Sequence, residues 1–196
     1  MNERLFLLKI ELSHIEPKIW RRFAVPASIS LDRLHDVIQI VMGWGDSHLF
    51  EFDIDKKQYT EDPETEEDGF ECGEYRLGDL LEKEGESFRY IYDFGDNWDH
   101  VLTIEDSNYV DSELYSEIVC LDGEKACPPD DVGGPPGFIE FSNAIRDPEH
   151  ENHEETRKWV GDEYDVERFD SEIINIVLMQ YQRWSRDRHQ LWAEDE

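Results

Sequence analysis

Apolar and polar residues alternate along the first quarter of the chain in a way that predicts two strands, a helix and a third strand. From Leu5 to Leu12 every second residue is apolar, as in a strand with one buried face. Residues 18–25 and 49–54 predict two more strands. Between them, Leu31 to Met42 has an apolar stripe of helical period, with Ser30 as candidate N-cap. This strand-strand-helix-strand order is typical of a β-grasp-like opening.

Residues 88–105 form the densest aromatic run of the chain and predict a β-hairpin. Apolar side chains recur at every second position on both sides of a turn-like Gly95-Asp96-Asn97 segment. A loop of two or four residues would put the two apolar sets on opposite faces, whereas three or five residues gather them on one face. Because burial specifies register, we expect an odd loop, and favour three residues with Asn97 in the left-handed conformation.

The remaining pattern predicts two irregular stretches between short elements. Residues 61–74 carry eight acids and no base, which predicts a solvated loop. Residues 122–137 hold four prolines and four glycines, which predicts an ordered loop without regular structure. Helices are predicted at residues 77–81, 138–146, 154–159 and 171–184, and a strand near residues 115–120.

The last helix, expected to begin after Asp170 as N-cap, carries the apolar residues predicted to form its buried stripe. These are Ile173, Ile174, Val177, Tyr181 and Trp184. Together the elements predict a single α+β domain over residues 1–196, with a mixed sheet that includes the central hairpin and with the C-terminal helices packed against it.

The charge changes the range of expected functions. The chain has 49 acidic and 19 basic residues and a net charge of −30. Affinity for nucleic acid depends on Lys and Arg displacing counterions, so direct DNA binding is disfavoured, as is docking on anionic lipid. We interpret the acidity as serving solubility or adaptation to a salty cytoplasm. An alternative is an acidic mimic of nucleic acid that occupies a DNA-binding partner.

The cysteine count and the hydropathy indicate the compartment. Three cysteines, Cys72, Cys120 and Cys127, do not suggest a disulfide framework. The first residues resemble no signal peptide, because Lys9 and Glu11 interrupt a short apolar run. No apolar stretch approaches the ~20 residues of a membrane span. We expect a cytoplasmic, reduced protein.

Several segments in one order resemble the Ri-plasmid ORF-3-like family. They are WRRFAV, LDRLHDVIQIVMGW followed by HLFEF, YIYDFGDNWDH and CLDGEKACPPDDVGGPPGF. The resemblance spans Leu5 to about Asn175, leaving out the acidic residues 61–74 and those after Gln180. The family also covers passenger proteins of some insertion elements that carry a TnpR-type resolvase label. Members of the family occur on plasmids, in mobile elements and in ordinary chromosomes. The resemblance implies an α+β domain, and it implies no activity and no catalytic residue.

The resolvase label can be tested against the residues. A serine recombinase needs a nucleophilic Ser among several arginines, and a basic DNA-binding region. Arg21 and Arg22 are neighbours on a predicted strand and therefore point to opposite faces. The other arginines, Arg183, Arg186 and Arg188, lie near the end of the chain. No segment gathers Arg and His around a Tyr, as a tyrosine recombinase requires. Recombinase catalysis is not expected.

One candidate site is a zinc centre built from Cys120, Cys127 and His100, with Asp93, Asp96 or Asp130 as a further ligand. Zinc accepts these ligand types in a tetrahedral shell. Six residues separate the two cysteines, whereas zinc knuckles use two to four. The alternative is that Cys120 ends a strand as a small buried apolar residue and Cys127 packs the loop.

A second candidate is acid–base chemistry by Asp93, Asp96 and His100, which requires them to lie within hydrogen-bond reach of one another. With an odd hairpin loop, His100 lies in the aromatic face while Asp93 and Asp99 point away. The sequence therefore favours a core histidine with a satisfied hydrogen bond over a catalytic one.

Two weaker candidates remain. His35 falls on the apolar side of the first helix and His48 at the start of the next strand, where both could border a pocket with Trp44 or serve packing. The GGPPG segment before a helix could cradle an anion. Asp130 and Asp131 immediately upstream disfavour a phosphate there.

These observations predict a non-catalytic protein-interaction or accessory module, associated with mobile elements through the family resemblance. Its expected partner is another protein, and no cofactor is expected. The alternative is a metal-binding protein or enzyme with a site between the hairpin residues 93–100 and the loop residues 120–137.

Overall fold

The centre of the fold is a mixed β-sheet of eight strands in the described part of the chain, in the order β5-β4-β3-β6-β7-β1-β2-β8. The computed structural model describes residues 4–65, 68–112, 114 and 116–192, and side chains as far as residue 184. The pair β4–β5 is parallel and the other pairs are antiparallel. The strands are β1 (Leu5–Leu12), β2 (Trp20–Pro26), β3 (Phe50–Ile54), β4 (Lys57–Thr60), β5 (Phe70–Glu71), β6 (Ser87–Tyr92), β7 (Trp98–Tyr109) and β8 (Val119–Glu124).

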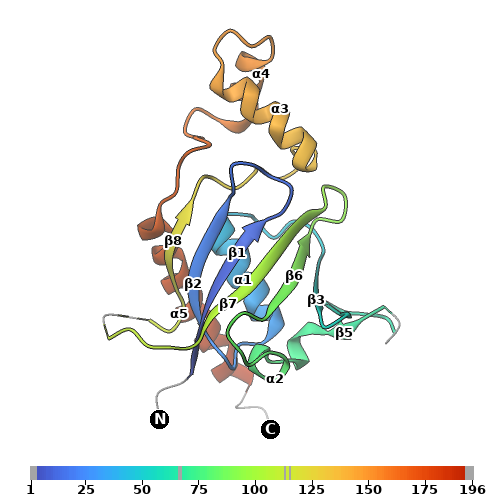
Figure 1. Cartoon of the computed structure of the whole chain (residues 1–196), viewed down its shortest axis with the longest axis vertical. Helices are drawn as coiled ribbons and strands as arrows, with labels where there is room; N and C mark the ends of the chain where they lie inside the picture. Colours follow the sequence, from blue (N-terminus) through green and yellow to red (C-terminus); the bar gives the residue numbers. More distant parts are fainter. Residues whose placement is uncertain (1–3, 66–67, 113, 115, 193–196) are drawn as a thin grey trace.

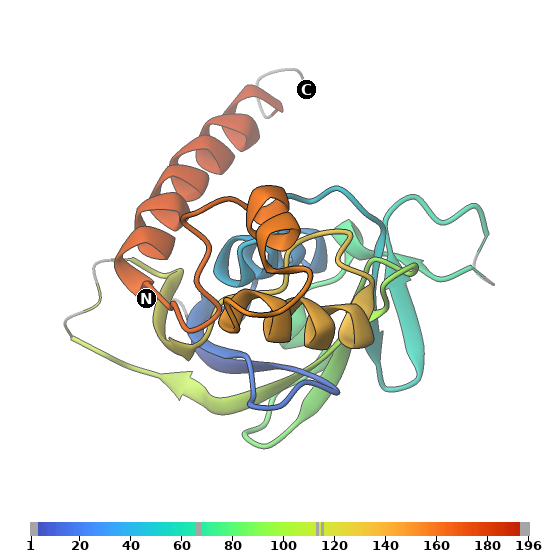
Figure 2. The same ribbon diagram turned by 90° about the horizontal axis from the view of Figure 1, so that it is seen from above.

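The longer helices lie on one side of the sheet and at one end of it. The sheet curls around α1, α5 runs along β8 and α1, and α3 and α4 stand beyond the strand ends (Figures 1 and 2). The helices are α1 (Leu31–Met42), α2 (Leu77–Leu80), α3 (Gly134–Arg146), α4 (His153–Val160) and α5 (Ser171–Trp192), with a 3₁₀ turn η1 (Cys72–Glu74). The predicted α+β domain with a mixed sheet is confirmed. Among the described residues, no helix has the length and apolarity that crossing a membrane requires.

The opening elements follow the sequence pattern closely. In β1 every second side chain is buried, and α1 spans the predicted residues with Gly43 in the left-handed conformation at its C-cap. Ser30 occupies the N-cap, although its side chain makes no capping bond. The strand-strand-helix-strand order is confirmed. In the sheet, β6 and β7 lie between β1 and β3, so the aromatic hairpin occupies the middle.

The central hairpin has an odd loop, as predicted, but of five residues and not three. Tyr92 pairs with Trp98, which leaves residues 93–97 in the loop. Asn97 is left-handed as expected, and so is Asp93. Because β6 ends at Tyr92, Asp93 no longer follows the alternation of the strand. Its side chain is buried at the base of the loop and does not point to the outer face of the sheet as predicted. Phe94 becomes half exposed for the same reason.

Both irregular stretches contain more structure than predicted. β8 continues to Glu124, and α3 begins at Gly134, so residues 122–137 are irregular only in their middle. Two prolines fit in the first turn of α3 because N–H groups there need no helical partner. The acidic residues 61–74, of which 66–67 lie outside the described residues, end in β5 and η1, where Cys72 is buried. The strand predicted near residues 115–120 begins at Val119, and residue 115 lies outside the described part.

The buried stripe predicted for the last helix is wrong at three positions. Ile173, Val177 and Trp184 are 50%, 42% and 72% exposed. The helix instead packs through Ile174, Leu178, Tyr181 and Gln182, on β8 and α1. The N-cap is confirmed, since Asp170 Oδ1 accepts a bond of 3.1 Å from the amide of Ile173. The prediction failed because this segment is apolar on nearly all sides, so periodicity alone does not select the packed face.

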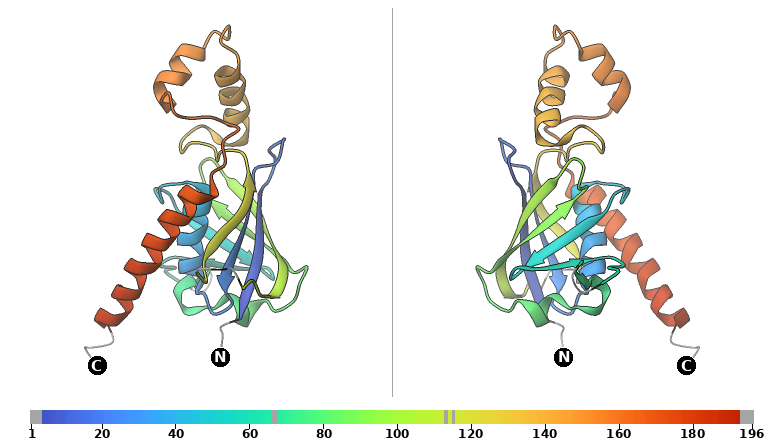
Figure 3. Two further views of the ribbon diagram at one scale, coloured as in Figure 1. Left: turned by 90° about the vertical axis from the view of Figure 1, so that its left-hand side faces the viewer. Right: turned by 90° about the vertical axis from the view of Figure 1, so that its right-hand side faces the viewer.

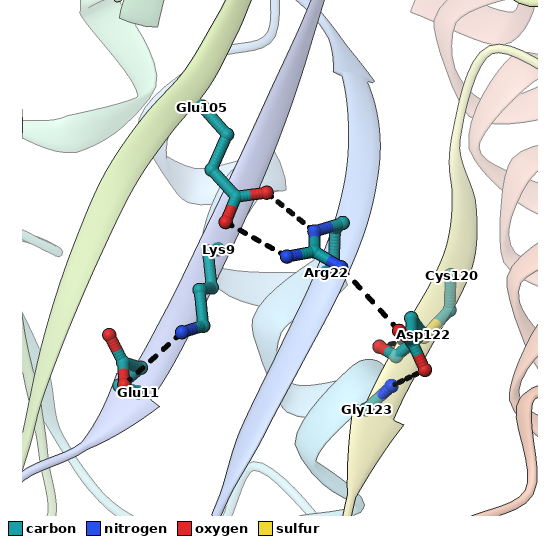
Figure 4. A network of polar contacts seen from close by, with 7 residues as sticks. All are labelled: Lys9, Glu11, Arg22, Glu105, Cys120, Asp122 and Gly123. Atoms are coloured by element: carbon teal, nitrogen blue, oxygen red, sulfur yellow. Dashed lines mark hydrogen bonds and ion pairs between the residues drawn. The ribbon is translucent and has the colours of Figure 1, made fainter. Parts of the chain in front are cut away.

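The neighbours Arg21 and Arg22 point to opposite faces of β2, as predicted. The Arg21 guanidinium is buried and donates to the backbone oxygens of Val41 (2.9 Å) and Lys125 (2.8 Å). On the other face, Arg22 forms a two-pronged ion pair with Glu105 and reaches Asp122 at 3.5 Å (Figure 4). Each arginine therefore has a structural role that explains its presence on a strand.

Candidate functional site

Three segments meet at one end of the sheet and form what we call the junction: residues 45–49 before β3, the hairpin loop 93–97, and residues 128–133 before α3. The amide of Asp93 donates to the carbonyl of Leu49 (2.9 Å) and that of Ser47 to the hydroxyl of Tyr92 (3.1 Å). The indole of Trp44 donates to the carbonyl of Pro128 (3.0 Å). These bonds hold the hairpin loop and the Pro/Gly loop together, in the region where the sequence placed its alternative site.

Aromatic rings form the inner wall of the junction. The ring of Trp44 lies 4.8 Å from that of Tyr92 and meets His100 edge-on at 5.1 Å. Burial, the largest effect, raises the pKa of Tyr92 to about 12, so its hydroxyl stays protonated and can donate and accept hydrogen bonds. The same wall encloses His100 completely.

His48 lies where the loops converge. Its Nε2 is 3.7 Å from Asp93 Oδ2 and 3.5 Å from Asp131 Oδ1, and its ring meets Tyr92 edge-on. The Nε2 atom is buried and has no hydrogen-bond partner. Buried polar atoms are usually paired, which makes this nitrogen a candidate ligand atom. Asp93 fixes its own loop, because its Oδ1 accepts from the amides of Gly95 (2.9 Å) and Asp96 (3.3 Å).

The helix start at GGPPG is occupied by a carboxylate of the protein itself. Asp96 Oδ2 accepts a hydrogen bond of 3.1 Å from the amide of Gly133, the N-cap of α3. The backbone at Gly134 has a φ of +67°, and a Cβ there would lie 2.5 Å from the carbonyl oxygen of Asp96. Glycine is required for this approach. The anion that the motif could cradle is therefore supplied by the hairpin loop.

The junction opens to solvent through a hollow of about 520 Å³. Its lining includes Asp46, His48, Asp93 and Phe94. Leu49, 66% exposed, and the half-exposed Phe94 give its rim an apolar part. Deeper in the junction, desolvation raises the pKa of Asp130, the largest of several effects that include an opposing attraction by His48.

The donor set at the junction suits a divalent cation. One ligand atom each from His48, Asp93 and Asp131 lies within 4.8 Å of the other two. Imidazole nitrogen and carboxylate oxygen are ligands that Zn²⁺ and other divalent ions accept. A second such group in the described residues is His35, Asp36 and Asp46. There both ring nitrogens of His35 already have partners, Tyr90 (2.8 Å) and Asp46 (2.9 Å), so the imidazole serves packing against Phe50.

Comparison with known proteins places the fold and these loops in a family. The sequence profile described as plasmid pRiA4b ORF-3-like protein matches residues 4–173. The chain belongs to this family. The match includes the junction and the whole sheet, and it ends within the first turn of α5.

Two proteins similar to this chain have descriptions that name no activity. The uncharacterized protein y4hQ of Sinorhizobium fredii (strain NBRC 101917 / NGR234) is 42% identical over 156 residues, which is 79% of each chain. The crystal structure of MM3350 from Methanosarcina mazei Go1, a protein of unknown function, has a TM-score of 0.78 and 32% identity. It covers 88% of this chain and 98% of its own. The likeness supports the α+β fold and assigns no activity to the family.

The structure does not bring the sulfur ligands of the predicted zinc site into a ligand group. Among the described residues, neither group with suitable spacing contains Cys120, Cys127 or His100. All three cysteines are free and buried. Desolvation, the largest effect, raises the pKa of Cys120 to about 11 and that of Cys127 further still. Both thiols lie near the guanidinium of Arg21, which acts in the opposite direction.

The predicted acid–base residues are separated by the fold. His100 faces the core, where its Nδ1 donates to the carbonyl of Tyr90 (3.1 Å). Asp93 and Asp96 lie in the loop, and Asp99 pairs with Arg89 across the outer face (3.0 Å). The sequence named His48 only as a pocket border and did not include Asp131. No local sequence signal pointed to the group, because it forms only where residues 45–49, 93–97 and 128–133 meet.

Proposed function

We propose that the protein is a non-catalytic interaction module that binds a protein partner through an apolar stripe on α5. We call this surface the α5 stripe and define it as Ile173, Ile176, Val177 and Trp184, all exposed by 42% or more. At 100° per residue these four positions fall within about 100° of one another around the helix. Exposed apolar residues gathered on one side of a helix are typical of interaction sites.

Trp184 borders a hollow between α1 and α5, and the other three residues of the α5 stripe lie on the side of the helix away from its packed face. The helix is docked through its other side, where Asn175 bonds both the amide (2.7 Å) and the carbonyl (2.8 Å) of Cys120. On the same side the hydroxyl of Tyr181 donates to Asp36 (2.9 Å). Leu178 is fully buried there. Because the helix is already held, the apolar residues on its outer side are not needed for its attachment. This is the observation that carries the proposal.

Protonation supports the non-catalytic part of the proposal. Desolvation, as the largest effect, raises the pKa of Cys72 to about 12 and that of Cys120 to about 11, which suppresses the nucleophilic thiolate. His100 is enclosed, and burial lowers its pKa to about 4. A neutral, inaccessible imidazole is unsuited to proton transfer with a substrate.

Site-specific photocrosslinking in the native host tests the proposal. A photoreactive residue at position 180, which lies within the arc of the α5 stripe, should give one discrete covalent adduct with a protein. The matched control is position 110, where Val110 is 81% exposed at the end of β7, outside α5. We expect no adduct at position 110. Absence of an adduct at position 180, or the same adducts at both positions, would contradict the proposal.

A second candidate function is divalent-cation binding at the junction, and the buried, unpartnered Nε2 of His48 favours it. Titration calorimetry with Zn²⁺ should show one site in the wild type and a loss of affinity of about 100-fold or more in His48→Ala. His14→Ala is the control, since the side chain of His14 is 72% exposed.

Cys120→Ser separates this cation site from the sulfur-ligated zinc site predicted from the sequence. If the junction holds the ion, Cys120→Ser binds Zn²⁺ like the wild type. If His48→Ala bound Zn²⁺ like the wild type and Cys120→Ser lost binding, the ion would be held by the cysteine sulfurs and the junction site would be wrong.

A further inference from the structure

We infer that the partner at the α5 stripe is a second copy of this chain, whose α5 packs antiparallel against the first. This inference rests on the proposed function and names the occupant of the same surface. The stripe is part of one straight face of a helix, and a two-fold axis lets a single such face serve as both halves of an interface. Its spacing of three, four and seven residues is the spacing with which helices interdigitate.

The charges on α5 favour the antiparallel copy. Within the described side chains of the helix, the charged residues are Glu172 near its start and Arg183 near the last described side chain. If two helices pack antiparallel around a centre between residues 177 and 178, Glu172 of one copy lies opposite Arg183 of the other, because the two positions are equally far from that centre. The pairing occurs twice by symmetry. A parallel arrangement would place each charge at the same level as its like-charged copy and would bring no opposite charges together.

The position of α5 in the molecule leaves room for this contact. Figure 3 shows the helix running along the outside of the body, with its C-terminal end extending beyond the sheet. Figure 2 shows its side away from α1 uncovered by any other element. A second helix can therefore lie along α5 while the two sheets stay on opposite sides of the pair. Helix pairs of this kind approach to about 8–10 Å between axes.

The net charge also distinguishes a second copy of the chain from a cationic protein as the partner. The chain carries a net charge of −30, so a basic partner would be attracted over a long range and lost as salt rises. Among the side chains described as far as residue 184, the α5 stripe has one acid and one base beside it, so this part of the helix does not itself select a cation. Two copies repel each other through their net charge and adhere through apolar contact. Their association should therefore tighten as salt screens the repulsion.

Sedimentation equilibrium of the full chain tests the inference. We expect a monomer–dimer equilibrium at up to about 200 µM protein, and a lower dissociation constant at about 0.5 M NaCl than at about 0.02 M. Val177→Glu should raise the dissociation constant about 100-fold or more, because symmetry buries two like charges near the axis. Val110→Glu, the same substitution at an exposed site outside α5, should leave it unchanged.

A charge swap tests the antiparallel direction without altering the apolar surface. Arg183→Glu should raise the dissociation constant about 5- to 30-fold, since two ion pairs become two repulsions. Adding Glu172→Arg should restore wild-type association. In addition, Val177→Cys should form an interchain disulfide on mild oxidation, because this position lies beside the axis and the native cysteines are buried.

The possible outcomes distinguish the two proposals. A wild type that remains monomeric at all concentrations overturns the dimer, and a photocrosslink from position 180 to a different protein then still supports the interaction module. A dimer that forms equally well with Val177→Glu, or that weakens as salt rises, also overturns the inference. A restored dimer in the charge swap supports it.

Discussion

His100 illustrates how one residue of a functional type can be used for structure. Its Nδ1 donates to the carbonyl of Tyr90, so in the neutral ring Nε2 carries no proton, and this atom is buried without a partner. Burial, the largest effect, lowers the pKa to about 4. The alternation of apolar residues in the hairpin predicted its place in the aromatic face, because an odd loop leaves no other register. The unpaired nitrogen was not predictable, since it depends on which rings surround it.

This buried imidazole makes stability depend on pH. Between pH 6.5 and 4 the unfolded chain binds a proton at His100 that the folded chain does not, so folding free energy is lost as the pH falls through this window. From pH 7 to 4.5 the loss attributable to His100 is about 2 kcal/mol. We predict that His100→Leu loses less stability over this range than the wild type, by about that amount, in urea unfolding.

The control for this measurement is His14→Leu, because His14 is exposed. It should lose as much stability as the wild type does between the two pH values. If His100→Leu and the wild type showed the same dependence on pH, the ring would be protonated in the folded protein, and its assignment as a neutral core residue would be wrong.

At the scale of elements, the junction depends on contacts between loops that are distant in sequence. The hairpin loop and the start of α3 are joined by the bond from the amide of Gly133 to Asp96, 37 residues apart. Turn chemistry identified both segments as irregular. It could not show that one supplies the anion for the other, because local composition contains no information on which loops meet.

We predict that Asp96→Ala destabilises the fold by about 1 kcal/mol, the usual net value of one such hydrogen bond. Chemical unfolding, followed by hydrogen exchange at the amide of Gly133, measures the loss and locates it. Asp162→Ala, which removes an exposed carboxylate between α4 and α5, should change stability by less than about 0.5 kcal/mol. Unchanged protection of the Gly133 amide in Asp96→Ala would show that the bond does not hold the helix start.

The last helix shows the same limit at the level of packing. Its existence and its N-cap Asp170 followed from sequence, because both are local. The choice of packed face did not, since Ile173, Ile174, Ile176 and Val177 give the segment apolar residues on several sides. β8 and α1 pack against the face of α5 that contains Leu178. The α5 stripe remains exposed and is the basis of both proposals about partners.

For the whole molecule, the net charge of −30 and the apolar alternation have separate consequences. We expect the charge to act on association with other molecules: it should oppose binding to nucleic acid and attract a basic partner only over a long range. The alternation concerns the fold, and it identified strands, helix α1 and the central hairpin. The family membership agrees with this architecture. In the described part of the chain the sheet is completed by β4, just before the acidic residues 61–74, and by β5, which lies within them.

The sequence by itself determined what depends on neighbours along the chain: the period of strands and helices, the odd hairpin loop, the helix caps and the charge. The physical reason is that backbone geometry places residues two or about four positions apart on one face. Only the tertiary structure decided what depends on residues far apart. It brought His48, Asp93 and Asp131 together, assigned Asp96 to the start of α3, and chose which side of α5 is covered. Those contacts arise when whole elements pack, and packing is a property of the assembled sheet and helices.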